Sequence, residues 1–268
     1  LASAFAEVKF FDGLTFKTVF APDFIYSPEH RYWNKYHGNG PAYNGRLDKY
    51  STTDLMYTST NTFNYTKTFS DLHHINVMAG MEYWQSSYEY LYAAGKNILG
   101  DMQELAAASD FLSPNSNTTK ETLISYFGRA EYAYSDKYNA SFSLRTDGSS
   151  VFGDNTKWGT FWSAGLSWRL KQENFLKDVE WLDQLKARFS YGTSGNKAGI
   201  GRYASKGLWT VDADYKYNGS AGSILTQLAN KDLSWESQKM LNVGVDFGFF
   251  NSIFGSIDYF HKISDGLL

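Results

Sequence analysis

The sequence contains no cysteine and no apolar run of about twenty residues, and its charges are not gathered in any one segment. The absence of cysteine excludes disulfides and thiolate metal sites. The absence of a long apolar run excludes a membrane-spanning helix of ordinary length. The formal net charge is −3 with both signs scattered, so no surface suited to nucleic acid is expected. These absences leave a β-rich chain as the class to test.

The motifs of common catalytic sites are also missing. There is no G-x-S-x-G, no H-E-x-x-H and no P-loop. The carboxylates are dispersed, and no pair is spaced for acid–base chemistry. His73 and His74 are neighbours near a predicted turn, and neighbouring strand residues point to opposite faces, so a shared metal is not expected. We therefore predict that the chain is not an enzyme and needs no cofactor.

Aromatic residues, by contrast, are abundant. Phe, Trp and Tyr make up 18% of the chain, with 20 Tyr and 20 Phe. The mean hydropathy is nevertheless only −0.43, so many polar residues accompany the rings. Membrane β-barrels combine these properties, because apolar and polar residues alternate along each strand and cancel on average.

The alternation is clearest in residues 121–170. Three runs there place apolar, aromatic or small residues at every second position and mostly polar or charged residues between them. Such runs predict antiparallel strands with one face toward lipid and one toward a wet lumen. In one run the apolar side consists of Tyr138, Ala140, Phe142 and Leu144, and the polar side of Asn139, Ser141, Ser143 and Arg145. The rings predicted to face lipid are Tyr126, Tyr132, Tyr134, Tyr138, Phe142, Trp162, Trp168, Phe189 and Tyr191.

Similar patterns along the chain predict about ten strands in one all-β, antiparallel up-and-down transmembrane β-barrel domain over residues 1–268. Predicted connections alternate between two length classes, and alternate connections of such a barrel lie on the same rim. Bacterial outer-membrane barrels have short periplasmic turns and long extracellular loops. We also expect a type I′ turn at Asp12-Gly13, a short helix at 97–108 and a small hairpin within 195–234. The shorter connections are 12–13, 68–73, 135–137, 171–183 and 251–252, and the longer ones are 26–49, 93–120, 146–158 and 195–234.

Two groups of side chains are candidates for contact with a solute. Five cations should face the lumen, because charge facing lipid at mid-bilayer would cost about 2–4 kcal/mol. They either line a wet channel and pair with Glu131, Asp246 or a plug inside the barrel, or guide an anionic ligand. Rings in the predicted loops either stack on a ligand or pack against the loops or a lid protein. The cations are Arg129, Arg145, Arg169, Lys186 and Arg188, and the rings are Tyr32, Trp33, Tyr36, Trp209, Tyr215 and Tyr217.

The segment Asp147, Gly148, Ser149 and Ser150 has the composition of a turn. Asp can bond its own backbone, and Gly permits positive φ. We expect this segment to shape the rim where a strand meets a loop. A ligand-binding role for Asp147 is the alternative.

Several segments resemble the barrel of SusC-type TonB-dependent outer-membrane receptors of Bacteroidetes. The resemblance is convincing over 121–268 and weaker over 1–120. It implies a large closed barrel, an N-terminal plug, a TonB-binding segment and a surface lipoprotein partner of the SusD type. The resembling segments are R-x-D-G-S-S-x-F-G at Arg145–Gly153, K-W-G-x-F at Lys157–Phe161, Trp168-Arg169, and residues 181–196, 232–251 and 255–268.

The chain begins at Leu1 without a methionine and ends within a predicted strand, so it is expected to be part of a barrel without its plug domain or terminal strand. From the resemblance we expect an outer-membrane receptor that imports oligosaccharides or peptides, contacts membrane lipid and reaches the TonB complex through a missing N-terminal region. The alternatives are a passive outer-membrane porin and a soluble carbohydrate-binding β-sandwich.

Overall fold

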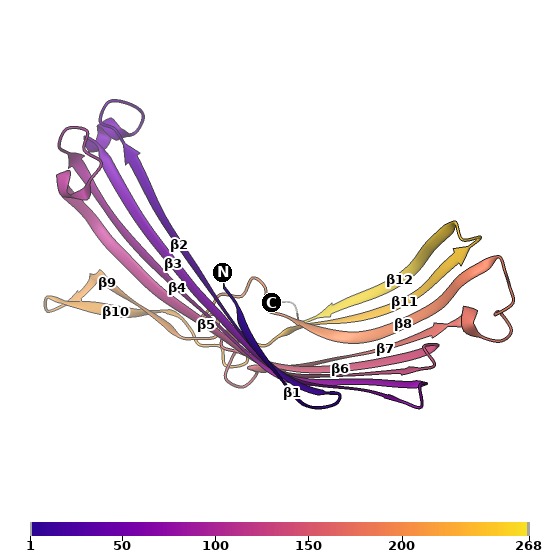
Figure 1. Cartoon of the computed structure of the whole chain (residues 1–268). Coiled ribbons are helices and arrows are strands. Elements are labelled where there is room, and N and C mark those ends of the chain that lie inside the picture. The colour runs from indigo at the N-terminus through magenta and orange to yellow at the C-terminus, as the bar shows by residue number, and fades with distance from the viewer. Residues whose placement is uncertain (1, 267–268) are drawn as a thin grey trace. The chain divides into compact units, whose positions relative to one another are not determined.

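The computed structural model describes residues 2–266, except for the side chains at 113, 212–215 and 217. Ten strands form one sheet in the order β1-β2-β3-β4-β5-β6-β7-β8-β11-β12, and β9 and β10 form a separate hairpin (Figure 1). This confirms the predicted all-β, antiparallel up-and-down fold of about ten strands. The strands are β1 (Ala4–Phe11), β2 (Leu14–Trp33), β3 (Arg46–Phe69), β4 (His73–Ile98), β5 (Ala108–Tyr134), β6 (Tyr138–Ser149), β7 (Trp158–Arg169), β8 (Leu182–Asn196), β9 (Leu208–Tyr217), β10 (Ser220–Gln227), β11 (Glu236–Phe249) and β12 (Ile253–Asp265).

The chain divides into two compact units. The first contains Phe20–Thr58 and Trp84–Thr122 with the N-terminal residues up to Ala4, and the second contains Phe5–Val19, Ser59–Tyr83 and the chain from Leu123 onward. Strands β2 to β5 contribute residues to both units. In the part of the chain that the structure describes, no helix is long and apolar enough to cross a membrane.

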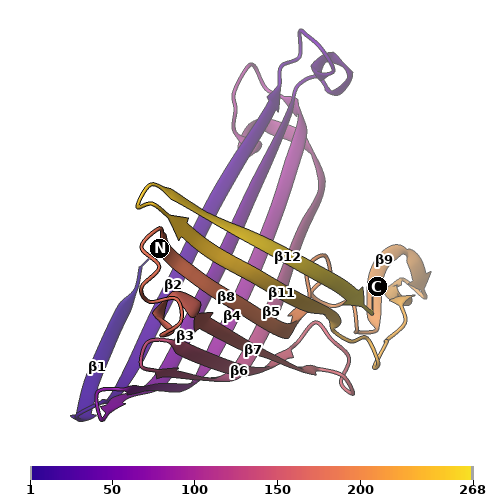
Figure 2. The same ribbon diagram turned by 90° about the vertical axis from the view of Figure 1, so that its right-hand side faces the viewer.

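The register of the second unit places most apolar and most polar side chains on opposite faces, although Phe127 and Phe161 share the polar face with Arg145. Strands β6, β7, β8, β11 and β12 lie side by side (Figure 2). Because side chains alternate along a strand, residues that pair across strands share one face of the sheet. One row is apolar and the next is polar. The apolar row is Tyr132, Ala140, Leu166, Phe189 and Val243, and the polar row is Glu131, Ser141, Gly165, Ser190 and Asn242.

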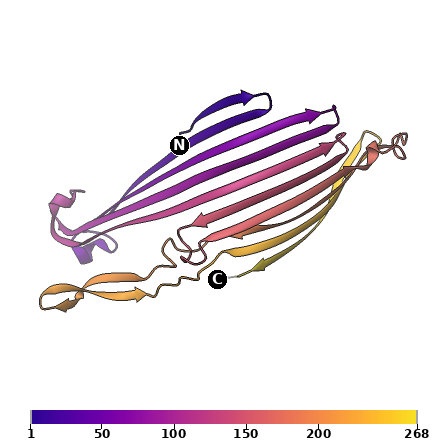
Figure 3. The ribbon, with the colours of Figure 1, turned by 90° about the horizontal axis from the view of Figure 1, so that it is seen from below.

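Tight turns join these strands at one end of the sheet. The backbone N–H of Ser135 donates to Leu72, that of Arg169 to Lys137, and that of Phe250 to Trp181. Each of these connections is thus hydrogen-bonded to a neighbouring one, which brings them together at one rim, and Figure 3 shows the strands running side by side between the ends.

The turns themselves differ from the expected types. Two consecutive residues with positive φ occur at Ser135-Asp136 and at Phe250-Asn251, as a type I′ turn requires. At Asp12-Gly13 only Gly13 has positive φ, 91°, so the type I′ turn expected there is wrong. Asp, Asn and Ser tolerate the left-handed region well enough to replace glycine at most of these corners.

Two predicted long loops are wrong in extent. Half of 26–49 and most of 93–120 is strand: β2 continues to Trp33 and β3 starts at Arg46, and β4 continues to Ile98 and β5 starts at Ala108. Pro28 suggested a loop, yet Pro28 and Pro114 both lie where the neighbouring strand is shorter. The pairing of β5 with β6 begins at Leu123, so Pro114 lies outside it and has no partner in β6. Proline is tolerated at such edges because no ladder hydrogen bond is lost.

The short helix expected at 97–108 is also wrong. β4 continues to Ile98, Asn97 within it has a φ of 55°, and only one 3-10 turn, η2 (Leu105–Ala107), lies in the segment. Leu105 and Ala107 pack against buried Leu47, Ile98 and Ala108, which form the core of the first unit. The two other 3-10 turns are η1 (Gly40–Tyr43) and η3 (Leu170–Gln172). The hairpin expected within 195–234 is present as β9 and β10.

Candidate functional site

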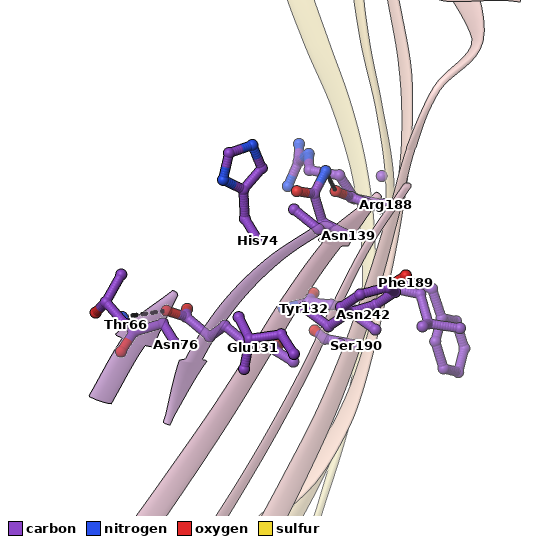
Figure 4. A pocket seen from close by; sticks show the side chains of 18 of the residues that line it. Thr66, His74, Asn76, Glu131, Tyr132, Asn139, Arg188, Phe189, Ser190 and Asn242 are labelled. Carbon is purple, nitrogen blue, oxygen red and sulfur yellow. Dashed lines mark hydrogen bonds between the residues drawn. The ribbon is translucent and has the colours of Figure 1, made fainter. Parts of the chain in front are cut away.

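A polar pocket opens on the polar face of the second unit. Its volume is about 520 Å³, and residues of eight adjacent strands, β3 to β8, β11 and β12, line it. The lining residues include Asn76, Glu131, Asn139, Arg188 and Asn242 (Figure 4). Asn76 Nδ2 donates to Glu131 Oε2 at 3.4 Å, while its Oδ1 is buried without a partner. The pocket therefore combines amide, hydroxyl and charged groups that can bind polar solutes.

Arg188 is the central cation of this pocket. Its Nε and Nη2 both donate to Asp246, with the Nη2–Oδ1 distance 2.7 Å, and Nη2 lies 3.0 Å from Asp258 Oδ1. Gly244 lies between these groups on β11. A Cβ there would overlap Asp258 Oδ1 and lie 3.0 Å from Arg188 Nη2, so glycine leaves the space through which Arg188 reaches β12. One cation thus ties together three strands.

The Arg188→Gln substitution should lower the stability of the folded protein by about 1–3 kcal/mol, because both carboxylates lose their charged donor. Asp258→Asn should cost less, since that carboxylate is more exposed and makes the weaker contact. The measurement is the temperature at which the intact protein loses its folded electrophoretic mobility in SDS. Equal midpoints for wild type and Arg188→Gln would show that the ion pairs contribute nothing to stability.

The remaining predicted cations lie on the same face. Arg145 donates to Asp147 Oδ1 at 2.7 Å and to Ser125 Oγ at 2.8 Å, and lies 3.3 Å from Glu82 Oε1. Arg129 pairs with Glu131 on its own strand. Arg169 and Lys186 are directly opposite each other in register, next to the short turns. Local acids therefore balance three of the five predicted cations, Arg129, Arg145 and Arg188.

The predicted loop rings are not gathered at one place. Tyr32 lies in β2 and packs against the core cluster of the first unit. Trp33 lies beside the Arg46 guanidinium, 5.2 Å from the ring centroid. Tyr36 and Trp209 are exposed, at 60% and 65%. Tyr215 and Tyr217 belong to β9, and their side chains lie outside the described residues.

A tyrosine network in the first unit escaped the sequence interpretation. Asp48 is 1% exposed and accepts two hydrogen bonds from Arg46, at 2.7 and 2.8 Å, and one from the Tyr50 hydroxyl at 3.3 Å. The Tyr50 ring lies 4.9 Å from that of Tyr92, whose hydroxyl accepts from Arg46 at 3.2 Å. Residues 46–49 had been placed in a loop, so the period-two signal that aligns Arg46, Asp48 and Tyr50 was not followed.

The DGSS segment is ordered by packing rather than by turn chemistry. Asp147 and Gly148 still belong to β6, and Asp147 bonds Arg145 instead of its own backbone. Gly148 does not have positive φ. A Cβ there would lie 2.8 Å from the Trp158 ring, so the glycine makes room for that indole. The expectations that Asp147 bonds its own backbone and that Gly148 adopts a positive φ are therefore wrong. Ser149 is fully buried, and Ser150 follows the end of the strand.

This segment and the residues that follow it, 147–157, contact Ser205 and residues 231–235. We call these three parts together the clasp. Phe152 is fully buried, and its ring lies 4.4 Å from that of Trp235. The N–H of Gly153 donates to Leu233 at 2.9 Å, and Ser205 Oγ donates to the Phe152 carbonyl at 2.9 Å. The clasp thus holds the long connection between β8 and β11 on both sides of the β9–β10 hairpin, at Ser205 and at residues 231–235.

An ion cluster supports the clasp. Lys157 and Lys206 both bond Asp154 Oδ1, at 3.0 and 3.3 Å, and these hydrogen bonds hold the pKa of Asp154 below its usual range. Lys206 belongs to the long connection, whereas Asp154 and Lys157 follow β6. The pairing therefore joins the same two segments as the ring contact.

Histidines do not form a metal site. His73 Nδ1 lies 2.7 Å from the Tyr132 hydroxyl, on the apolar face, and His74 Nδ1 lies 2.8 Å from Thr68 Oγ1 and lines the polar pocket. Within residues 2–266, no group of three or more His, Asp or Glu side chains is placed to hold a metal ion.

Comparison with known proteins places this two-faced sheet in a family. Residues 6–268 match the family described as TonB dependent receptor-like, beta-barrel. The chain belongs to this family. TonB-dependent receptor P3 of Formosa agariphila is 31% identical over 281 residues, which cover 100% of this chain and 27% of the relative. The match confirms the resemblance to TonB-dependent receptors and replaces the soluble β-sandwich as an interpretation.

The SusC subtype is supported in the same way. TonB-dependent receptor SusC of Bacteroides thetaiotaomicron is 41% identical over 155 residues, 56% of this chain and 16% of that protein. The RagAB peptide importer in its closed-closed state has a TM-score of 0.89 at 26% identity, covering 98% of this chain and 29% of the solved chain. The matched region is 27% of the length of TonB-dependent receptor P3 and 29% of the solved RagAB chain, so the chain spans little more than a quarter of either protein.

Proposed function

We propose that the chain forms part of the wall of a TonB-dependent receptor that imports oligosaccharides or peptides across the outer membrane of a Bacteroidetes-type cell. The observation that carries the proposal is the division of the second unit into a mostly apolar, ring-bearing face and a mostly polar face with a hydroxyl- and amide-lined pocket. Lipid solvates the first face, and the polar solute passes along the second. The proposed role is transport without catalysis by this chain.

The partners follow from the same assignment. RagAB is described as a peptide transporter, and SusC is a TonB-dependent receptor. We propose that a SusD-type surface lipoprotein covers the end that carries the long connections. We further propose that a region preceding this chain in the intact receptor provides the plug and the contact with the TonB complex. The short turns then lie at the periplasmic rim.

Uptake by cells that produce the intact receptor tests this proposal. Fluorescent oligosaccharides and peptides of graded length are supplied to cells with and without the receptor gene, and each strain is measured with and without its TonB genes. We expect receptor-dependent uptake of one solute class that disappears when TonB is removed. Receptor-dependent uptake that continues without TonB would favour the passive porin instead.

A further inference from the structure

A second hollow lies on the opposite, apolar face of the second unit. This groove has a volume of about 710 Å³ and is almost entirely apolar. Its floor contains Ala140 and Ala187. Its walls are formed by four rings, those of Tyr132, Tyr138, Trp168 and Phe189. It is separate from the polar pocket, because Phe189 and Arg188 are consecutive in β8 and project to opposite faces (Figure 4).

The register explains the groove. Ala140 pairs with Tyr132 on one side and Leu166 on the other, and Ala187 pairs with Trp168 and Val245. Small side chains between large ones leave the backbone uncovered, and side chains stand nearly perpendicular to a sheet. The two alanines occupy adjacent rows of the apolar face, so their hollows join into one groove.

The walls are held in place by a polar anchor at the turn end. Glu173 accepts hydrogen bonds from the Tyr138 hydroxyl and from Trp168 Nε1, the latter at 2.9 Å. The Tyr138 and Trp168 rings lie 6.1 Å apart and are nearly parallel, at 21°. Because both polar tips are bonded to one carboxylate, the rings keep their orientation without a ligand, which lowers the entropy cost of binding.

A cation lies at this end of the groove. Lys137 Nζ is 3.2 Å from Glu173 Oε2 and 5.8 Å from the centroid of the Tyr138 ring. An ammonium group has three donors, and one is used by Glu173. The charged pair therefore adjoins the groove at Tyr138 and Trp168, two of its lining residues, next to the short turns. Aromatic residues of membrane barrels meet lipid headgroups at this level.

We propose that the groove is a specific site for one phospholipid of the periplasmic leaflet, with an acyl chain over Ala140 and Ala187 and the phosphate at Lys137. The inference rests on the proposed function, because it requires that the apolar face meet lipid and that the short turns be periplasmic. Acyl chains complement a dry, ring-walled groove, and phosphate complements the ammonium group. The rings of this face thus select a lipid in addition to contacting the bilayer in general.

Native mass spectrometry of the intact receptor in mild detergent tests the site. Wild type should retain one phospholipid per receptor. The double substitution Ala140→Leu and Ala187→Leu fills the floor and should lower the retained fraction about tenfold, equivalent to about 1.4 kcal/mol. Lys137→Gln should lower it by a smaller factor. The matched control is Ala164→Leu, on the same face but outside the groove, which should retain lipid as wild type does.

Equal phospholipid retention by wild type and the double variant would overturn the inference, as would wild-type retention no higher than that of unrelated detergent-solubilised barrels. Membrane fractionation of the same cells separates this outcome from failure of the proposed function. A receptor found in the outer membrane with unchanged lipid retention contradicts only the groove. A receptor absent from the outer membrane contradicts the proposed function itself.

Discussion

The Ala164→Arg substitution is expected to reduce the amount of folded receptor in the outer membrane severely, whereas Ser163→Arg is expected to leave it nearly unchanged. The two residues are neighbours in the middle of β7 and project to opposite faces. Ala164 pairs with Phe142 and Tyr191 on the apolar face. Ser163 pairs with Ser143 and Gly192 on the polar face. The two substitutions therefore add the same charge at the same height, with only the face changed.

The physical basis is the cost of placing a charge in hydrocarbon. Arginine facing lipid near the bilayer midplane costs about 2–4 kcal/mol, and this cost falls toward the interfaces. On the polar face the guanidinium stays hydrated. Ser163→Arg loses only the 2.7 Å hydrogen bond with Ser143, which contributes about 1 kcal/mol. The difference in unfolding free energy between the two variants should thus be several-fold larger than the effect that either substitution would have on the exposed surface of a soluble protein.

The measurement is the urea-induced unfolding free energy of the intact receptor in lipid vesicles, together with the fraction that retains folded mobility in unheated SDS gels. We expect Ala164→Arg to lose about 2–4 kcal/mol and Ser163→Arg to lose less than about 1 kcal/mol. Equal losses would mean that the two faces have been assigned to the wrong solvents or that β7 does not cross the bilayer.

The Gly153→Val substitution is expected to release the long connection between β8 and β11 without unfolding the sheet. A Cβ at this position would overlap the carbonyl of Lys231 and lie 2.8 Å from the Asp232 nitrogen. Both are backbone atoms that belong to the connection, so the clash cannot be relieved by rotating a side chain. Overpacking of this kind costs about 1–3 kcal/mol. The hydrogen bond from Gly153 to Leu233 should then be lost as well.

Limited proteolysis of the intact receptor measures this release. When opening is fast, cleavage follows the population of the open form, so residues 197–230 should be cut about tenfold or more faster than in wild type. The matched control is Gly201→Val, in the same connection, because a Cβ there meets nothing within 4 Å and the glycine does not have positive φ. Faster cleavage in both variants, or in neither, would show that the clasp does not hold the connection.

Sequence reasoning succeeded where local pattern and tertiary structure agree. In β6 to β8 and in β11 every second residue is apolar, and tight turns transmit that alternation from strand to strand, so the faces followed directly. It failed in 26–49, where Pro28 and several glycines conceal a strand that continues beyond its neighbour. The same error removed Arg46, Asp48 and Tyr50 from consideration as members of one face.

The clasp could not be derived from the sequence for a different reason. Phe152 and Trp235 are separated by two strands and a long connection, and nothing in either local segment indicates that the rings meet. Gly148 illustrates the same limit, because glycine in a D-G-S-S segment suggests a turn, whereas its role is to accommodate Trp158 from the next strand. Long-range packing of this kind leaves no periodic signal in a single sequence.

The clasp also separates the β9–β10 hairpin, where a change in sequence length costs little free energy, from the strands of the sheet, where it costs more. The connection between β8 and β11 is held at its base by Phe152, Trp235 and Leu233, while the β9–β10 hairpin extends beyond that base (Figure 1). Lengthening a loop whose ends are already fixed costs little, because closure entropy grows only slowly with length. Descendants of such a receptor can therefore exchange or extend the hairpin while the wall, and the lipid around it, keep the same structure. New specificity can then arise by replacing one hairpin, with no compensating change in any strand.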